Sequence, residues 1–516
     1  MKKWYYKSLC ALLGVTMVLG AFSSCGEETV ENIPVSLPNY ADDCALDLLG
    51  YVNPTNGKYT YDGVELDVGE DFRTVERFKE YKEAGFNIAF ARYDSALPAD
   101  VTAEGWATSD TKLLCDMAYE AGLSKILLTD YYFDDLVTYS AGDLVGTSGS
   151  ARYATQEEMD ADIAARLSIY KNTPGFYGVI MKDEPHYEWF SNYALVYKSI
   201  KRAMPEIYVY HNLPFDYKFH IDENVWKEQH NGEAPTRGEA YIKYLSDFLE
   251  MTGAENLSID VYPFKDRPEE RLNFFWHVQV LQQLCAQYGA EVSFTLQSIC
   301  YTSGETLANR ILTKNDLWLQ MNTLLGFGAT SLQYYTYFPH PENTSTQSNI
   351  GNFMDKYGNK TSVYYDAKKV NEDVLKFDHI LLNYKFQGAK MYLANMMTAG
   401  TSKDYIGKDD HSFINNWEHT LLKDLSFNND ALLTTELKDS QNNLYMYMIM
   451  NPIDVLYSEN GVMSYTECTF TANFPGYDYV AEFDCGELTY VKLDNGKYTH
   501  SLSSGYAVYL IPLKVA

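Results

Sequence analysis

Two adjacent carboxylates stand at the end of an apolar segment in the first half of the chain. Residues 176–181 read Phe-Tyr-Gly-Val-Ile-Met and lead directly into Lys182, Asp183, Glu184 and Pro185. The apolar run predicts a buried strand, and proline cannot donate a hydrogen bond to a sheet, so the strand should end here. Proline also biases the residue before it toward an extended backbone, which we expect for Glu184. The pattern therefore predicts two acids where a strand becomes a loop.

Other polar and aromatic residues follow the ends of neighbouring apolar runs. If these runs are parallel strands, their carboxyl ends gather at one rim, where α/β proteins carry their active sites. A single Asp or Asn at a strand end is usually a helix cap or a turn former. Together, however, the residues bring carboxylates, amides and rings to one rim. The set is Arg92, Asp94, Asp130, Asp183, Glu184, His211, Asn212, Asp260, Tyr262, Gln297, Tyr334, Tyr335 and Tyr337.

This combination of side chains suits the hydrolysis of a glycosidic bond. That reaction needs one carboxylic acid to protonate the leaving oxygen and a second carboxylate that acts as nucleophile or base. We expect Glu184 to be the acid and Asp260 to be the second carboxylate, with Asp183 as a third acid beside them. The remaining residues would bind the sugar: Arg92, Asp130, His211, Asn212, Tyr262, Gln297, Tyr334, Tyr335 and Tyr337.

Eight strand-and-helix units would position these residues. Apolar runs of strand length alternate with amphipathic segments of helix length. The expected strands are 48–52, 87–93, 125–129, 177–181, 207–211, 257–261, 292–297 and 331–335. The expected helices are 72–84, 111–121, 156–170, 187–203, 238–250, 269–288, 314–326 and 363–382. Eight units predict a (β/α)₈ barrel, and no glycine-rich nucleotide turn follows an early strand, which argues against an open doubly wound sheet.

The pattern changes after residue 385. Short alternating stretches such as 444–450 and 506–511 are separated by turn-forming clusters, which predicts an antiparallel β-sandwich. Cys468 and Cys485 could form a disulfide between neighbouring strands of it. The loop 339–361 is long enough to act as a flap over the substrate. The predicted organisation is a signal peptide (1–24), a tether (25–44), the barrel (45–385) and the sandwich (386–516).

Neither a cofactor nor a metal is expected from the motifs. The run Gly-Phe-Gly at 326–328 lies between a helix and a strand, which is the wrong context for a dinucleotide-binding turn. The histidines show no metal-ligand spacing, and the chain has no Cys-x-x-Cys motif. These motifs therefore leave carboxylate chemistry as the expectation.

The barrel segments resemble the (β/α)₈ glycoside hydrolases of the β-galactosidase-like superfamily, in a lipoprotein branch. The resemblance covers most of the barrel and is carried by residues 178–185, 258–264, 326–337 and 355–360. It implies an acid/base Glu at the end of the fourth strand, which corresponds to Glu184, although Asp183 replaces the usual Asn before it. It also implies a nucleophilic Glu near Gln297, where an amide cannot attack an anomeric carbon.

Several replacements for the missing nucleophile remain open. Asp260 on the sixth strand could supply the second carboxylate, and its separation from Glu184 would decide retention or inversion. Alternatively, Asp183 and Glu184 resemble the acidic pair of substrate-assisted hexosaminidases, in which the Asp orients a 2-acetamido group and the Glu is the acid. A further alternative is a non-catalytic glycan-binding lipoprotein. The missing strand-seven acid favours it, whereas the presence of the costly acid pair opposes it.

The N-terminus has the form of an export signal. Three lysines among the first seven residues precede the apolar run 9–22, and Ser-Ser-Cys follows it. The context of Cys25 resembles a bacterial lipoprotein box, so we expect lipidation of Cys25 and a lipid anchor at the outer membrane. The acids Glu27 and Glu28 resemble a signal for export to the cell surface.

The charge of the chain narrows its partners. The formal charge of −29 becomes −32 once the three lysines of the signal peptide are removed. This excess of acid argues against nucleic acid as a partner. An oligo- or polysaccharide is the expected partner, because 45 tyrosines supply rings that can stack on sugars. The sequence does not identify a protein partner.

Overall fold

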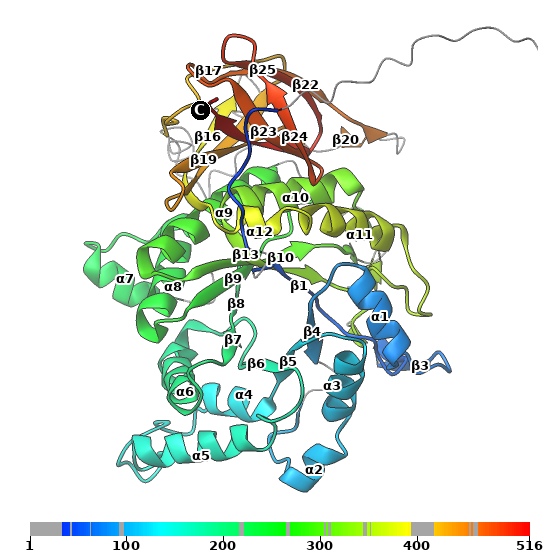
Figure 1. Cartoon of the computed structure of the whole chain (residues 1–516). Helices are drawn as coiled ribbons and strands as arrows, with labels where there is room; N and C mark the ends of the chain where they lie inside the picture. Colours follow the sequence, from blue (N-terminus) through cyan, green and yellow to red (C-terminus); the bar gives the residue numbers. More distant parts are fainter. Residues whose placement is uncertain are drawn as a thin grey trace, which may run out of the picture. The chain divides into compact units, whose positions relative to one another are not determined.

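A computed structural model gives the structure of this chain (Figure 1). It describes residues 33–515 with gaps at 42–43, 62, 92–96, 216–220, 265–268, 304–305, 308–310, 344–347, 351, 394–416, 454–455 and 458–462. The predicted signal peptide (1–24) and Cys25 lie outside the described residues, as do Arg92 and Asp94.

Nine parallel strands form one sheet in the order β7-β6-β5-β4-β1-β13-β10-β9-β8. Its two edge strands, β7 and β8, are separated in the sequence only by His211. The continuous stretch Tyr208–Pro214 therefore pairs with β6 on one side and with β9 on the other, which closes the sheet into an eight-stranded barrel. The predicted (β/α)₈ barrel is confirmed.

The strands of the barrel match the eight predicted strands within a few residues. Their bounds are β1 (Asp47–Gly50), β4 (Ile88–Ala91), β5 (Lys125–Thr129), β6 (Phe176–Ile180), β7 (Tyr208–Tyr210), β8 (Asn212–Pro214), β9 (Asn256–Asp260), β10 (Glu291–Gln297) and β13 (Ala329–Tyr335). Most of their residues are buried on both faces, as continuous apolar runs predict for a parallel sheet.

The eight predicted helices all form around the strands. They are α1 (Val75–Glu83), α3 (Asp110–Glu120), α5 (Gln156–Ser168), α6 (Phe190–Ala203), α8 (Arg237–Thr252), α9 (Glu269–Tyr288), α10 (Lys314–Gly326) and α11 (Ser362–Val374). Shorter helices are α2 (Ala103–Ala107), α4 (Tyr131–Val137), α7 (Glu223–Gln229), α12 (Asp378–Leu381) and a 3₁₀ turn (Tyr187–Trp189). None of the helices in the described ranges is both long and apolar enough to cross a membrane.

The long loop after β13 lies at the carboxyl-end rim of the barrel. Its strand β14 (Glu342–Asn343) pairs with β2 (Lys58–Tyr61), which forms a hairpin with β3 (Val64–Asp67) after β1. Its strand β15 (Ser348–Ile350) pairs with β11 (Cys300–Ser303), which follows β10 and also pairs with β12 (Thr306–Leu307). Because these partners all follow carboxyl ends of barrel strands, the loop lies on the side predicted for a flap.

The C-terminal region consists of antiparallel sheets, as predicted. One sheet has the order β16-β18-β19-β26-β23-β24 and the other β17-β22-β25. Their bounds are β16 (Lys385–Leu393), β17 (Asp424–Phe427), β18 (Ala431–Asp439), β19 (Leu444–Met450), β22 (Glu467–Asn473), β23 (Tyr479–Asp484), β24 (Glu487–Lys492), β25 (Lys497–Ser503) and β26 (Ala507–Leu513). A short hairpin joins β20 (Leu456–Tyr457) and β21 (Met463–Ser464).

The larger sheet is buried on both faces, because one face covers the sandwich core and the other covers the barrel. In β19 the side chains of Tyr447 and Ile449 belong to the sandwich core. The alternating residues Met446, Met448 and Met450 belong to the core shared with the barrel helices. Figure 1 shows α10, α11 and α12 between the parallel strands and this sheet. The apolar run 444–450 thus reflects two cores rather than one.

The boundaries between the predicted regions stay predictions, since residues Val35–Ala516 form one compact unit. Part of the predicted tether (25–44) packs against the C-terminal sheets. The backbone N–H of Leu37 donates to the hydroxyl of Tyr490 at 3.1 Å, and the Tyr40 hydroxyl donates to Oδ2 of Asp439 at 2.9 Å. The predicted disulfide is wrong, because Cys468 on β22 and Cys485 after β23 are both free thiols.

Candidate active site

Three carboxyl groups converge at the carboxyl ends of β6 and β9. Asp260 is the last residue of β9 and is 7% exposed, whereas Glu184 follows β6 and is exposed. The Glu184 carboxyl forms a hydrogen bond with the Asp260 carboxyl, and Asp183 acts on Asp260 through its charge. Oδ1 of Asp260 is buried and has no hydrogen-bond partner among the described residues. The closed barrel thus brings together the three acids that the sequence singled out.

The Asp260 carboxyl has a strongly perturbed ionisation. Burial raises its pKa well above the usual range, and the charges of Glu184 and Asp183 and the hydrogen bond with Glu184 raise it further. Two carboxyl groups in contact titrate as a pair, because the second negative charge is costly beside the first. The Asp260 carboxyl therefore keeps its proton to a higher pH than an isolated carboxyl group would.

The backbone at Glu184 departs from the sequence prediction. Glu184 has a φ of +47°, in the left-handed region, rather than the extended conformation expected before Pro185. Such a conformation is costly for a non-glycine residue and persists only where neighbouring contacts hold it. Here the Glu184 N–H donates to the carbonyl of Asn212 at 3.0 Å. The Tyr244 hydroxyl donates to the carbonyl of Pro185 at 2.6 Å.

Asn212 at the start of β8 contacts both neighbouring acids. Its side-chain Nδ2 donates to Oδ1 of Asp183 at 3.1 Å, while its carbonyl accepts from the Glu184 N–H. Asn212 is 4% exposed. The structure therefore places Asn212 behind the acids rather than at the surface, and its predicted contact with a sugar stays a prediction.

Two tyrosines that follow or end different barrel strands stack on each other at the carboxyl-end rim. Tyr262 follows Asp260 by two residues, and Tyr335 ends β13. Their ring centroids are 5.9 Å apart with an interplanar angle of 23°. Tyr335 also packs edge-on against Tyr51, which follows β1. Both rings of the stacked pair are half-buried, so the mouth has an aromatic wall next to its acids.

Asp130 lies away from this group. It is completely buried and forms a bidentate ion pair with Arg166, at 2.7 Å from Nη2 and 2.9 Å from Nε. The Tyr170 hydroxyl and the Tyr132 N–H also donate to its carboxylate. With both oxygens occupied inside the protein, Asp130 is not placed to bind a substrate.

His211 points toward the helices instead of into the barrel. Its Nδ1 lies 2.8 Å from the Tyr193 hydroxyl, and its ring packs against Tyr197 and Phe248. Burial lowers the pKa of His211 to about 3, with a smaller contribution from the charge of Lys201. This histidine is a neutral core residue and not part of the mouth.

Gln297 serves the backbone of the loops around it. Its Oε1 accepts from the Phe264 N–H at 2.9 Å, and its Nε2 donates to the Ile299 carbonyl at 3.1 Å. The side chain of Gln320 forms hydrogen bonds with the backbone N–H and the backbone carbonyl of Gln297. The side chain at the expected nucleophile position therefore fixes the loop after β9 to the end of β10.

The two remaining tyrosines of the predicted set are core residues. The Tyr334 hydroxyl donates to Oδ1 of Asn371 on α11 at 2.8 Å, so this ring faces outward. Tyr337 is completely buried and packs edge-on against Tyr81 and Phe86. Arg92 cannot be placed, because it lies outside the described residues.

Sequence reasoning missed the polar residues beneath the mouth. Tyr244 from α8 contacts the backbone next to Glu184, and Tyr51, Tyr210 and Thr295 form hydrogen bonds inside the barrel. Inside-facing residues of a strand alternate with outside-facing ones. If Asn212 faces inward, the alternation predicts that Tyr210, two residues earlier, also faces inward. It also predicts that His211, which lies between them, faces outward.

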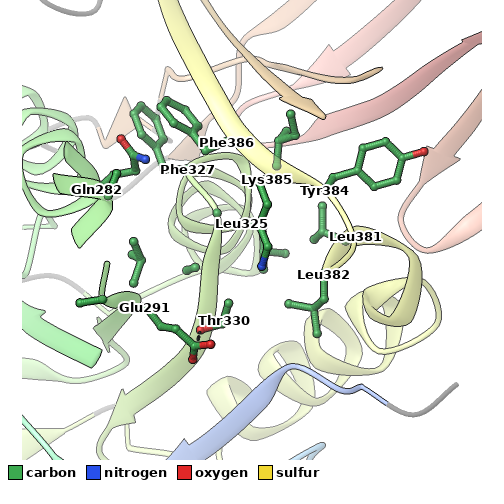
Figure 2. A pocket seen from close by; sticks show the side chains of 16 residues that line it. Gln282, Glu291, Leu325, Phe327, Thr330, Leu381, Leu382, Tyr384, Lys385 and Phe386 are labelled. Atoms are coloured by element: carbon green, nitrogen blue, oxygen red, sulfur yellow. Dashed lines mark hydrogen bonds between the residues drawn. The ribbon is translucent and has the colours of Figure 1, made fainter. Parts of the chain in front are cut away.

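A cavity of about 200 Å³ lies at the opposite ends of the strands. It is lined by the first residues of β10 and β13, by the end of α12 and by the start of β16 (Figure 2). Figure 2 shows Glu291, Thr330 and Lys385 among mostly apolar side chains. Because Glu291 begins the strand that Gln297 ends, this cavity is separate from the acid cluster.

The described ranges contain no cluster of three His, Cys, Asp or Glu side chains that could hold a metal ion. The side chains placed at the mouth carry carboxyl groups, an amide and aromatic rings. Among these, a carboxyl group whose pKa is raised by burial is the one best suited to give up a proton near neutral pH.

No protein-family model and no curated protein matches the chain. Solved structures with a similar arrangement include a family 39 glycoside hydrolase from the gut symbiont Bacteroides cellulosilyticus WH2. It has 11% identity and a TM-score of 0.46, and the match covers 92% of this chain and 83% of that chain. A glucosidase from Croceicoccus marinus has 11% identity and a TM-score of 0.39, with coverage of 92% and 100%. A family 5 mannosidase from Rhizomucor miehei has 13% identity and a TM-score of 0.39, with coverage of 66% and 95%. Similarity at this level carries no activity over to this chain.

The buried ion pair predicts that Asp130 acts on stability. We expect Asp130→Asn to lower the free energy of unfolding by roughly 3–5 kcal/mol, because it leaves the Arg166 charge buried without its counter-ion. Chemical denaturation of the purified variant measures this loss. Asp116→Asn is a matched control, since it breaks an exposed pair with Lys112 and should cost below about 1 kcal/mol. Equal losses for the two variants would contradict the structural role of Asp130.

Proposed function

We propose that this protein is a glycoside hydrolase in which Glu184 is the general acid and Asp260 is the second carboxylate. The observation that carries the proposal is the contact between a buried and an exposed carboxyl group at the mouth of a (β/α)₈ barrel. Glycosidic hydrolysis in most such enzymes needs two carboxyl groups that flank the bond. A site that served only to bind a sugar would have no use for a costly buried acid.

One proton on the Glu184–Asp260 pair supplies the acid and the carboxylate that this reaction requires. In the resting enzyme the proton is held by Asp260, whose pKa is raised by burial and by Glu184. Glu184 is exposed and can reach the leaving oxygen of a glycoside. Transfer of the proton from Asp260 to Glu184, and then to the leaving group, leaves Asp260 as the carboxylate next to the anomeric carbon.

The contact between the two carboxyl groups supports a retaining mechanism. Retaining enzymes have carboxyl groups about 5–5.5 Å apart, and inverting enzymes about 6.5–9.5 Å apart. Two groups that already share a hydrogen bond need only a small side-chain rotation to admit a sugar between them. A separation that also admits a water molecule would need a larger movement.

The aromatic wall of Tyr262 and Tyr335 supports a sugar as the substrate. Tyrosine presents an apolar face and a polar tip, which match the C–H face and hydroxyl groups of a sugar ring. The two rings lie at the rim where β9 and β13 end, the same rim that carries Asp260. This proposal names the class of substrate but not the sugar or the linkage.

A substrate-assisted reaction is the second candidate, and the contact of Asn212 with Asp183 favours it. That hydrogen bond fixes the Asp183 carboxylate beside Glu184, as orientation of a 2-acetamido group would require. In this version Asp260 would remain protonated throughout. A non-catalytic glycan-binding protein is a weaker candidate. Its main support is the amide at the expected nucleophile position. Because Gln297 has a role in the loop backbone, that amide is not by itself a sign of lost activity.

The acid role of Glu184 predicts a loss that depends on the leaving group. We expect Glu184→Gln to lower kcat by roughly 10²-fold or more on glycosides with poor leaving groups, because those need the proton. On activated aryl glycosides the loss should be much smaller. Steady-state rates on a panel of aryl and alkyl glycosides measure the difference.

Glu188→Gln is the matched control for this experiment, since Glu188 is an exposed acid four residues further along. Its rates should equal those of the wild type. Equal rates for Glu184→Gln and wild type would refute the acid role. Binding of glycan without turnover by the wild type would favour the glycan-binding protein.

The charge of Asp183 predicts a change in the pH profile. Activity requires the Glu184–Asp260 pair to keep one proton, so it is lost as the pH rises through the higher pKa of the pair. Burial raises the pKa of Asp260 most, but Glu184 and Asp183 raise it too. Asp183→Asn should therefore move the alkaline limb of the kcat/KM profile to lower pH.

Asp247→Asn is the control, because Asp247 pairs with Tyr187 and Lys243 outside the acid cluster. It should leave the profile unchanged. The same experiment separates the two catalytic candidates. If Asp183→Asn abolishes turnover and the wild type cleaves only N-acetylated substrates, the substrate-assisted reaction replaces the one that uses Asp260.

We further propose that the enzyme is lipid-anchored at the outer membrane and acts on an extracellular glycan from the cell surface. The form of residues 1–28 supports this location. Lipidation requires the Cys25 thiol. Cys25→Ser should therefore move the protein from the membrane fraction to the soluble fraction, as measured by fractionation and immunoblotting. Membrane association that persists in this variant would contradict the anchor.

A further inference from the structure

We propose that Asn212 is a positioning residue for the acid cluster and that the hydroxyl groups of Thr295 and Tyr210 fix the orientation of its amide. This inference rests on the proposed function and adds the residues that hold its acids in place. None of the three residues has to touch the sugar to act in this way.

Asn212 is connected to both of the acids that follow β6. Its Nδ2 donates to Asp183 at 3.1 Å, and its backbone carbonyl accepts from the N–H of Glu184 at 3.0 Å. The second contact holds the left-handed backbone of Glu184, which is costly without support. A change in the position of Asn212 would thus move the side chain of Asp183 and the backbone of Glu184 together.

The orientation of the Asn212 amide is set from inside the barrel. The Thr295 hydroxyl donates to Oδ1 of Asn212 at 3.3 Å, which leaves Nδ2 facing Asp183. The Tyr210 hydroxyl lies 3.2 Å from the Thr295 hydroxyl and at the same distance from Oε1 of Gln333. Tyr210 accepts in turn from the Tyr51 hydroxyl at 2.8 Å. Tyr51 donates to Tyr210 and Thr295 donates to Asn212, and a donation from Tyr210 to Thr295 joins these bonds into one chain that ends at Asp183.

The neighbouring side chains are compatible with this direction. The Ser258 hydroxyl donates to Oε1 of Gln333 at 3.1 Å, and Nε2 of Gln333 donates to Ser293 and Ser331. Oε1 of Gln333 also lies 3.2 Å from the Tyr210 hydroxyl and 3.5 Å from the Thr295 hydroxyl, so Gln333 belongs to the same network. A chain of aligned donors polarises each member and strengthens the last hydrogen bond, here the one to Asp183.

The location of the chain argues for a functional role over simple packing. Tyr51, Tyr210 and Thr295 are each 1% exposed, at a level of the barrel that branched apolar residues usually fill. Buried hydroxyl and amide groups are costly unless all are satisfied, and an apolar layer would avoid the risk. A hydrogen-bond chain that ends on a candidate catalytic acid explains why these polar groups are buried here.

Thr295→Val and Thr295→Ser form the matched pair that tests the proposal. Valine has nearly the same shape as threonine but cannot donate, so the Asn212 amide loses the bond that orients it. We expect Thr295→Val to lower kcat about tenfold with KM nearly unchanged, because misplaced catalytic groups slow the chemical step more than they weaken binding. The loss should grow with the pKa of the leaving group. Thr295→Ser keeps the hydroxyl and should stay close to the wild type.

Tyr210→Phe provides a second test that does not depend on the folding of Thr295→Val. It removes the hydroxyl behind Thr295 and should lower kcat in the same direction, with the same dependence on the leaving group. Purely structural roles would lower the melting temperature without this dependence. Rates of Thr295→Val and Tyr210→Phe that equal the wild type on all leaving groups would overturn the proposal.

The outcome for Glu184→Gln separates this inference from the proposed function. If Glu184→Gln slows poor leaving groups as expected and the Thr295 and Tyr210 variants do not, only the positioning role fails. If Glu184→Gln has no effect, the hydrolase proposal itself fails.

Discussion

The closure of the barrel by one seven-residue stretch is the constraint on which the site depends. Tyr208–Pro214 pairs with β6, which leads to Glu184, and with β9, which ends at Asp260. The two acids are far apart in the sequence and come together only because this stretch lies between their strands. Asn212 within it contacts Asp183 and the Glu184 backbone directly. The strand pairing that closes the barrel therefore also brings the two acids together.

Hydrophobic patterning was sufficient to predict the barrel, the sandwich and the rim that carries Asp183, Glu184 and Asp260. Which rim residues face inward is decided instead by the alternation of side chains along each strand. In a strand, neighbouring residues point to opposite sides, so Tyr334 and Tyr335 cannot both line the mouth. The structure has Tyr335 inside and Tyr334 on Asn371, and it has Asn212 inside and His211 among the helices. The same alternation excludes Tyr334 and His211 from the mouth, because each is adjacent in its strand to a residue that faces inward.

Other features could not be read from residue types. The proline after Glu184 predicts an extended backbone at Glu184. The backbone there is left-handed instead, and tertiary hydrogen bonds with Asn212 and Tyr244 hold the residues around it. Asp130 has the sequence context of a rim acid, yet Arg166 lies 36 positions further along and neutralises it in the core. Both outcomes depend on partners that only the folded chain brings within reach.

The relation between Asp260 and Gln297 changes the meaning of the missing strand-seven acid. In the register of the sheet Asp260 pairs with Thr295, two residues before Gln297, so both side chains point into the barrel from adjacent strands. A carboxyl group at Asp260 therefore lies one strand away from the expected nucleophile position and close to Glu184. The Gln297 amide accepts a hydrogen bond from the N–H of Phe264, so it holds the loop that follows Asp260 on the neighbouring strand. The position that first suggested a lost activity thus anchors the loop segment that follows Asp260.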